Sequence, residues 1–272
     1  MTFQPELQMT ARASAAAVTQ RQVMRSEWIK LRTVRSTWLV LAATVLGIVG
    51  LGLLVSYIGS TQWSAMSPSA RAEFNPINQD LIGVNVAELT IGVLGVLVAT
   101  GEYATGLIRT TFAAVPRRLP VLAAKAGVLA AVAFAVCLAA VLIAFLGGQA
   151  LLGSHGISIG QPEAVRAVFG ATLYLTVVAV AGLGLGFLIR STAGGIATLL
   201  GVLLVLPILV AALPGSLASA VERYLPSMAG RALFTMNTGH AMLSPWTGFA
   251  IFLLYAAAVL AAAALTLRRR DA

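Results

Sequence analysis

Six apolar stretches, each close to the length of a membrane-spanning helix, constrain this chain more than any other feature. A helix crosses the hydrocarbon core of a bilayer in about 20 residues. The stretches lie at 38–58, 81–99, 126–146, 167–189, 193–213 and 247–267. Only 10% of the residues are charged, against roughly a quarter in soluble proteins. We therefore predict an all-α integral membrane fold, with residues 37–272 forming a six-span transmembrane domain.

Lysine and arginine are distributed unevenly between the two sides of this predicted bundle. Fourteen of the 18 lie before the first span, after the second, after the fourth or after the sixth. Cytoplasmic segments of membrane proteins carry such an excess, so both termini are predicted to be cytoplasmic, with 1–20 as a mobile tail. The net charge of +9 does not indicate nucleic acid, because the basic residues cluster beside apolar runs. The expected partners are membrane lipids. Abundant Arg, Ala, Gly, Val and Leu are typical of a GC-rich bacterial genome, so we expect the bacterial plasma (inner) membrane.

Residues 21–36, RQVMRSEWIKLRTVRS, precede the first span and have the pattern of an amphipathic helix. At 100° per residue, arginines gather on one edge and apolar side chains fill the adjoining arc. Such a helix lies in the headgroup layer with its basic edge toward lipid phosphates. Glu27 falls within the apolar arc. We expect it to pair with Lys30 on its own helix, or with a cation on another segment such as the Arg-rich loop after the second span.

The segment 101–118, GEYATGLIRTTFAAVPRR, begins with the Gly-x-x-x-x-Gly spacing of a phosphate-binding loop. Such a loop continues with Lys and then Ser or Thr, whereas Leu107 and Ile108 follow here. The chain therefore lacks an ATPase motif, and the segments outside its spans are too short for an ATPase domain. His155 and His240 stand apart from Cys, Asp and Glu at metal-ligand spacing. We predict no catalytic residue, no metal site and no directly bound cofactor.

The second predicted span carries an acidic residue, Glu88, well inside the apolar stretch. An acidic side chain near the middle of a bilayer costs on the order of 3 kcal/mol, so it needs a partner. The polar and small residues that recur with it at steps of three and four are Asn85, Glu88, Gly92, Gly95, Ala99 and Glu102. This stripe is expected to face a partner helix, a dimer seam or a watery path. Glu88 either contacts a substrate or proton or is a hydrogen-bonded residue of the bundle.

Two outer segments contain more than simple connections. Residues 214–246 hold apolar pieces too short to cross a bilayer, separated by Pro226 and Gly230, and predict short helices at or dipping into the outer interface. The loop 59–80 is polar, with Trp63 and Phe74 as expected interfacial anchors. Pro207 is expected to bend the fifth span.

Two motifs together resemble a known family. RSEWIKLRTVRSTW before the first span and GEYATGLIRTTFAAVPRRLPVLAAK after the second are similar to the membrane permeases of type-2 ABC transporters, particularly those of actinobacteria. That family has an amphipathic connecting helix, six spans and a Glu-x-x-x-Gly segment that leads to Pro and a basic residue. The positions that the resemblance assigns to coupling with an ATPase subunit are Glu27, Glu102, Tyr103, Gly106, Arg109, Pro116, Arg117 and Arg118. Tyr103 departs from the charged residue that many relatives carry.

The resemblance implies an architecture and a partner. Two permeases pair, as a homodimer or with a paralogue, and each rests on a separate cytoplasmic nucleotide-binding ATPase subunit, in two copies, which uses ATP and Mg. A short helix over 104–114 would dock into that subunit. In the family the second and fifth spans line the translocation path, which implies that Asn85, Glu88, Gly92 and Gly95 face it.

The apolar spans favour export of an amphiphilic or hydrophobic compound such as a drug, an antibiotic or a lipid-like molecule over a sugar polymer. A membrane anchor, regulatory or immunity subunit that partners an ATPase without moving substrate is the main alternative. A secondary transporter is a third, although the spans have no clear inverted repeat.

Overall fold

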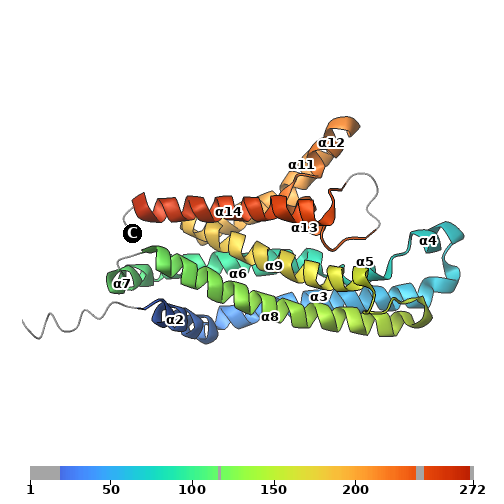
Figure 1. Cartoon of the computed structure of the whole chain (residues 1–272), viewed down its shortest axis with the longest axis horizontal. Helices are drawn as coiled ribbons and strands as arrows, with labels where there is room; N and C mark the ends of the chain where they lie inside the picture. Colours follow the sequence, from blue (N-terminus) through green and yellow to red (C-terminus); the bar gives the residue numbers. More distant parts are fainter. Residues whose placement is uncertain (1–18, 116–117, 237–241, 270–272) are drawn as a thin grey trace, which may run out of the picture.

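The computed structural model describes residues 19–115, 118–236 and 242–269, and the regular elements in this part of the chain are all helices. The predicted tail lies outside the described residues except at its last two positions. Long helices run side by side along the long axis of the molecule (Figure 1). The amphipathic helix α2 (Gln20–Thr33) and the short helix α7 (Leu107–Ala114) lie at one end, which we call the α2 end. Helix α4 (Pro68–Glu73) lies at the other, the α4 end (Figure 1).

Within the described residues, six helical segments are long and apolar enough to cross a membrane. Their bounds are Arg35–Gln62 (α3), Val84–Ala104 (α6), Arg118–Leu152 (α8), Pro162–Ile189 (α9), Thr192–Ala211 (α10 to α11) and Pro245–Arg269 (α14). The prediction of six apolar helices in an all-α fold is confirmed. Most of them extend beyond the apolar stretches, because a helix continues into polar flanks where its backbone is still hydrogen-bonded. With 35 residues, α8 is roughly 50 Å long.

The centre of the bundle is α9, which packs against α6, α8 and α14, while α3 packs against α6 and α8. Glycines set the close approach of α6 and α9. A Cβ atom on Gly95 would overlap the carbonyl oxygen of Ala179, and one on Gly182 would overlap that of Gly92. Lipid supplies no hydrophobic drive for helix association, so small residues that bring backbones together stabilise such a seam.

The close packing of α6 against α9 predicts that alanine substitutions at two glycines differ in their effect on stability. Gly95→Ala should lower the free energy of unfolding by about 1–3 kcal/mol, because overfilling a packed interior forces backbone shifts. Gly50→Ala is the matched control, since a Cβ there meets nothing within 4 Å. Unfolding by SDS in mixed micelles measures both variants. Equal stability of the two would contradict the assignment of Gly95 to a tight seam.

The fifth span changes its helical form before Pro207. Helix α10 (Thr192–Leu200) is followed by a π-helical turn, Gly201–Val205, and then by α11 (Leu206–Ala211). Proline has no N–H to donate, and its ring crowds the carbonyl four residues earlier, so a wider turn relieves the clash. The expected irregularity at Pro207 is therefore present. Beyond it, α11 and α12 leave the bundle at an angle (Figure 1).

The predicted amphipathic helix forms as α2, Gln20–Thr33. Thr19 and Gln22 form a capping box at its start, and Val34 is extended and separates α2 from α3. Capping of this kind satisfies N–H groups that the first helical turn leaves free. The face of α2 that contains Glu27 packs against α8.

The α4 end is built from short helices. Helices α4 (Pro68–Glu73) and α5 (Pro76–Asp80) follow α3, whereas α12 (Gly215–Glu222) and α13 (Pro226–Arg231) form within the predicted 214–246 segment. Of the latter two, α13 packs against α14 and α9. The expected anchors Trp63 and Phe74 contact each other edge to face at 5.2 Å, and Trp63 also stacks on His155 at 4.0 Å.

Candidate functional site

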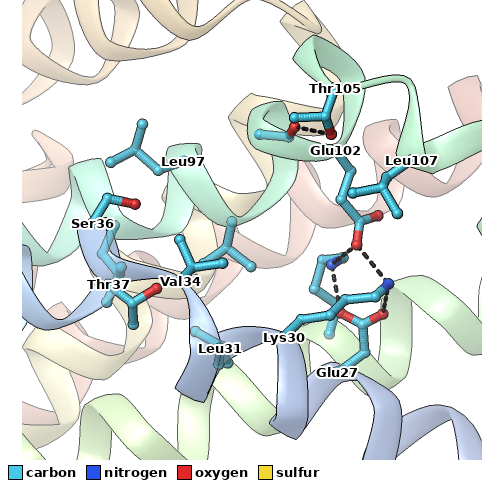
Figure 2. A pocket seen from close by; sticks show the side chains of 14 residues that line it. Glu27, Lys30, Leu31, Val34, Ser36, Thr37, Leu97, Glu102, Thr105 and Leu107 are labelled. Atoms are coloured by element: carbon cyan, nitrogen blue, oxygen red, sulfur yellow. Dashed lines mark hydrogen bonds and ion pairs between the residues drawn. The ribbon is translucent and has the colours of Figure 1, made fainter.

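Four charged side chains meet at the α2 end, where α2, α6 and α8 converge; we call Glu27, Lys30, Glu102 and Lys125 the charge cluster. Lys30 Nζ lies 2.8 Å from Glu27 Oε1 and 2.7 Å from Glu102 Oε1. Lys125 Nζ lies 2.5 Å from Glu27 Oε2 and 3.0 Å from Glu102 Oε1. Figure 2 shows Glu27 and Lys30 rising from α2 to meet Glu102 at the end of α6. The cluster therefore joins three helices through four ion pairs.

Burial makes this cluster an ordered structural unit. The side chains of Glu27 and Lys125 are each 2% exposed, and that of Glu102 is 9% exposed. Two carboxylates and two ammonium groups neutralise one another, which lets the group lie inside protein. Burial lowers the pKa of Lys30, but hydrogen bonds to Glu102 and Glu27 outweigh it and raise that pKa above its usual 10.5. Lys30 therefore stays cationic across the physiological pH range, and its contribution to stability is lost only in strong alkali.

The structure realises both alternatives for Glu27. It pairs with Lys30 on its own helix and also with a cation on another segment. That second cation is Lys125 of α8 rather than an arginine of the loop after α6. Sequence reasoning treated Lys125 only as the start of a span. The available signal was that α8 has no other charged residue after Arg118.

Tyr103 connects α6 to α9, a helix that does not contribute to the charge cluster. Its ring meets Phe187 of α9 at 6.1 Å, and the guanidinium carbon of Arg190 lies 5.3 Å from its centroid. Arg190 ends α9 in the left-handed conformation, with φ at 57°, just before the fifth span begins. An aromatic ring with a cation over its face is an attractive contact. Many permeases of the family that the motifs resemble carry a charged residue at this position. Tyr103 is uncharged and contacts the Arg190 guanidinium through its ring instead.

Helix α7 (Leu107–Ala114) forms within the segment predicted to couple to an ATPase. Gly106 starts it in the left-handed conformation, with φ at 72°, which reverses the chain after α6 and suits glycine. Ile108 and Phe112 face inward, while Leu107 and Arg109 are exposed. Helix α7 thus presents one open face at the α2 end.

Contacts on both sides hold α7 in place. Lys30 donates a 3.4 Å hydrogen bond to Thr111, and Arg118 lies 5.3 Å from the Phe112 ring. Arg118 also donates to the carbonyl of Leu267 in α14 at 3.1 Å. Pro116 and Arg117 lie outside the described residues. Of the eight positions assigned to coupling, the structure brings Glu27 and Glu102 into the charge cluster and places Tyr103, Gly106, Arg109 and Arg118 around it.

A second cluster surrounds Glu88, whose side chain is fully buried. Arg231 of α13 pairs with both of its oxygens, and Tyr174 of α9 donates its hydroxyl to it. The partner that Glu88 required is therefore within the chain. Sequence reasoning did not find Arg231, because 143 residues separate it from Glu88.

The other residues of the stripe have different surroundings. Asn85 is half-buried and donates to the carbonyl of Ile82 at 3.0 Å, and with Arg231 it lines a cavity near α13. Gly92 and Gly95 lie in the seam with α9. The stripe faces a partner helix, one of the three alternatives, and the lining of a translocation path by these residues stays a prediction.

A third polar group lies near the α4 end. Ser56 donates to Asp80 Oδ1 at 2.6 Å, and Gln149 donates to Oδ2 at 2.7 Å. Burial raises the pKa of Asp80 to about 6, although these two hydrogen bonds act in the opposite direction. An acid whose pKa is raised on folding makes the native state less stable as the pH rises between its unfolded and folded values.

The raised pKa of Asp80 therefore predicts that the folded chain is more stable at lower pH. Lowering the pH from 7 to 5 should raise the thermal midpoint of the purified chain, because Asp80 becomes protonated only when folded over much of that range. The difference between wild type and Asp80→Asn isolates this contribution, and the variant should have a flatter profile. Identical pH profiles in the two proteins would rule Asp80 out as the source.

The described residues contain no group of three or more His, Cys, Asp or Glu side chains suited to a metal ion. Comparison of the chain with known protein families and with curated proteins gave no match.

Proposed function

We propose that this chain is the membrane permease subunit of an ATP-driven type-2 ABC exporter. Two copies, or this chain and a paralogue, form the pathway, and two copies of a separate nucleotide-binding subunit hydrolyse ATP with Mg. The substrate is an amphiphilic or hydrophobic compound that moves outward across a bacterial plasma membrane. Two things support this proposal: the resemblance of the two sequence motifs and the geometry of the α2 end.

The main support for the proposal is that residues of both motifs meet in one buried cluster. Glu27 and Lys30 come from the first motif, and Glu102 and Lys125 come from the second. Motion imposed on α2 or α7 by a bound ATPase would reach α6 and α8 directly, because the ion pairs connecting them are shielded from water. An unbraced amphipathic helix would absorb such motion instead.

The same end of the molecule supports an orientation with both termini in the cytoplasm. Helices α2 and α7 and the end of α14 lie together there (Figure 1). Arg268 and Arg269 close α14, and Arg32 and Arg35 flank the break between α2 and α3. Basic residues at helix ends favour the cytoplasmic side. The exposed face of α7 would then meet the ATPase subunit.

A charge reversal on that face tests the proposal. Arg109→Glu should lower the ATPase stimulation that the permease gives to its partner by about tenfold, equivalent to about 1.4 kcal/mol of lost coupling. The partner for this assay would be a P-loop ATPase without membrane spans, which the proposal expects a neighbouring gene to encode. Arg223→Glu is the matched control, because Arg223 is also exposed but follows α12, beyond the fifth span.

Two measurements complete this test. Size-exclusion chromatography reports whether each variant still assembles with the ATPase, and phosphate release reports its rate. Normal assembly and normal stimulation in Arg109→Glu would contradict the role of α7. The lack of any neighbouring gene for such an ATPase would count against the whole proposal.

A further inference from the structure

A cavity of about 260 Å³ opens beside the charge cluster. Its walls are mainly apolar side chains of α2, α6 and the link between α2 and α3: Leu31, Val34, Leu94, Leu97 and Val98. The charge cluster forms its polar end, and Figure 2 shows Leu31, Val34 and Leu97 to one side of the Glu102 carboxylate. The volume is slightly below the roughly 300–1,000 Å³ typical of small-molecule sites, so it suits one alkyl chain or one ring.

One carboxylate oxygen at the polar end has no hydrogen-bond donor among the described residues. Glu102 Oε1 accepts from both Lys30 and Lys125, whereas Glu102 Oε2 is buried and has no partner among the described residues. Figure 2 shows this second oxygen turned toward Leu107, away from the bonded oxygen. A buried carboxylate oxygen without a donor is costly, and native structures rarely leave one.

The lysine donors have little to offer a ligand. An ammonium group donates three hydrogen bonds, and Lys30 already donates to Glu27, Glu102 and Thr111. Lys125 donates to Glu27 and Glu102, and its side chain is only 2% exposed. An anionic head group would approach the unpartnered oxygen of Glu102. A cationic donor would satisfy that oxygen and leave every ion pair in place.

We propose that this cavity binds amphiphiles with a protonated primary amine. The amine donates to Glu102 Oε2, and the apolar body lies against the leucine and valine walls. The site lies at the level of α2, which in the proposed orientation is the level of the head groups of the inner leaflet. A role of the cavity in loading a substrate for export rests on the proposed function, whereas binding of the amine to the cavity does not.

Equilibrium binding of tritiated dodecylamine tests this proposal, with the full chain in nanodiscs of phosphatidylcholine and empty nanodiscs as background. Unlabelled dodecylamine should compete at least about tenfold better than dodecanol or dodecanoate, as expected for one charged hydrogen bond. Equal competition by the three compounds would show that only the chain length matters and would overturn the amine site.

Two variants locate the site. Glu102→Gln should weaken dodecylamine binding by about tenfold, and Leu97→Phe, which fills the cavity without changing a charge, should weaken it as well. Glu73→Gln is the matched control, since Glu73 is exposed on α4. Thermal midpoints report folding, and Leu97→Phe remains decisive if Glu102→Gln unfolds.

Unchanged affinity in folded Leu97→Phe would overturn the proposal and leave a water molecule as the donor to Glu102. Amine binding without ATP-dependent transport would contradict the proposed function while the site itself stands. The two failures are therefore distinguishable.

Discussion

Replacing Lys125 with methionine should destabilise the chain by about 3–5 kcal/mol, the cost typical of removing one partner from a buried ion pair. Lys125 is 2% exposed and holds Glu27 and Glu102 together. Methionine has nearly the same length but no charge, so two buried carboxylates would share Lys30 alone. Stability is measured by SDS-induced unfolding in mixed micelles.

Lys30→Met provides the contrast for this prediction. Lys30 contacts the same two carboxylates, but a third of its side chain is exposed, so water replaces part of its effect. Its loss should cost clearly less. The double variant Lys125→Met/Glu102→Gln should recover part of the stability, because it removes a carboxylate that Lys125→Met leaves short of charge. Equal effects of the two lysines would contradict the buried cluster.

Replacing Arg231 with methionine should have an effect of similar size, about 3–5 kcal/mol, because Glu88 would stay buried without a cation. Tyr174 alone would then donate to it. Glu88→Gln should cost less, since Arg231 is 22% exposed and its guanidinium reaches water when the pair is lost. Mixed-micelle unfolding distinguishes the two variants.

The same substitution should loosen α13. Ser227 is fully buried in α13, so a Ser227→Cys reporter should react slowly with a water-soluble maleimide in the otherwise wild-type chain. Adding Arg231→Met should increase that rate, whereas adding Arg223→Met should not. An unchanged rate in the Arg231 variant would show that packing against α14 alone holds α13. Unchanged transport by a well-assembled Glu88→Gln complex would remove a substrate role for Glu88.

Local pattern was sufficient to predict the long helices of this fold, but not α4 and α5, which form where a polar loop was expected. Apolar length predicted six spans, the polar arc of 21–36 predicted α2, and Pro207 predicted an irregular fifth span. The stripe through Gly92 and Gly95 was correctly expected to face something other than lipid. These features depend on residues within a few turns of one another, where spacing alone fixes the face of a helix.

The partners of the buried charges depended on tertiary structure. The place of Glu88 within an apolar stretch predicted that it needs a partner. Arg231, however, lies on a short helix that follows the fifth span, and no spacing rule connects the two residues. Lys125 looked like a basic flank of the third span, because its depth is set by how far α8 extends beyond the apolar stretch. The cavity beside Glu102 is lined by Val34, between α2 and α3, and by residues of α2, α3, α6, α7 and α8, which are far apart in the sequence.

The most direct test of the account is transport by the reconstituted complex. Proteoliposomes are prepared with this chain and the partner ATPase that we propose for it. ATP is added outside, and uptake of a fluorescent amphiphilic amine into the lumen is followed. We expect uptake that needs ATP and Mg and disappears when the phosphate-loop lysine of the ATPase is changed to alanine. ATPase activity stimulated by this chain, without uptake of this amine or of drug-like and lipid-like amphiphiles, would contradict an exporter and favour a non-transporting anchor or immunity subunit.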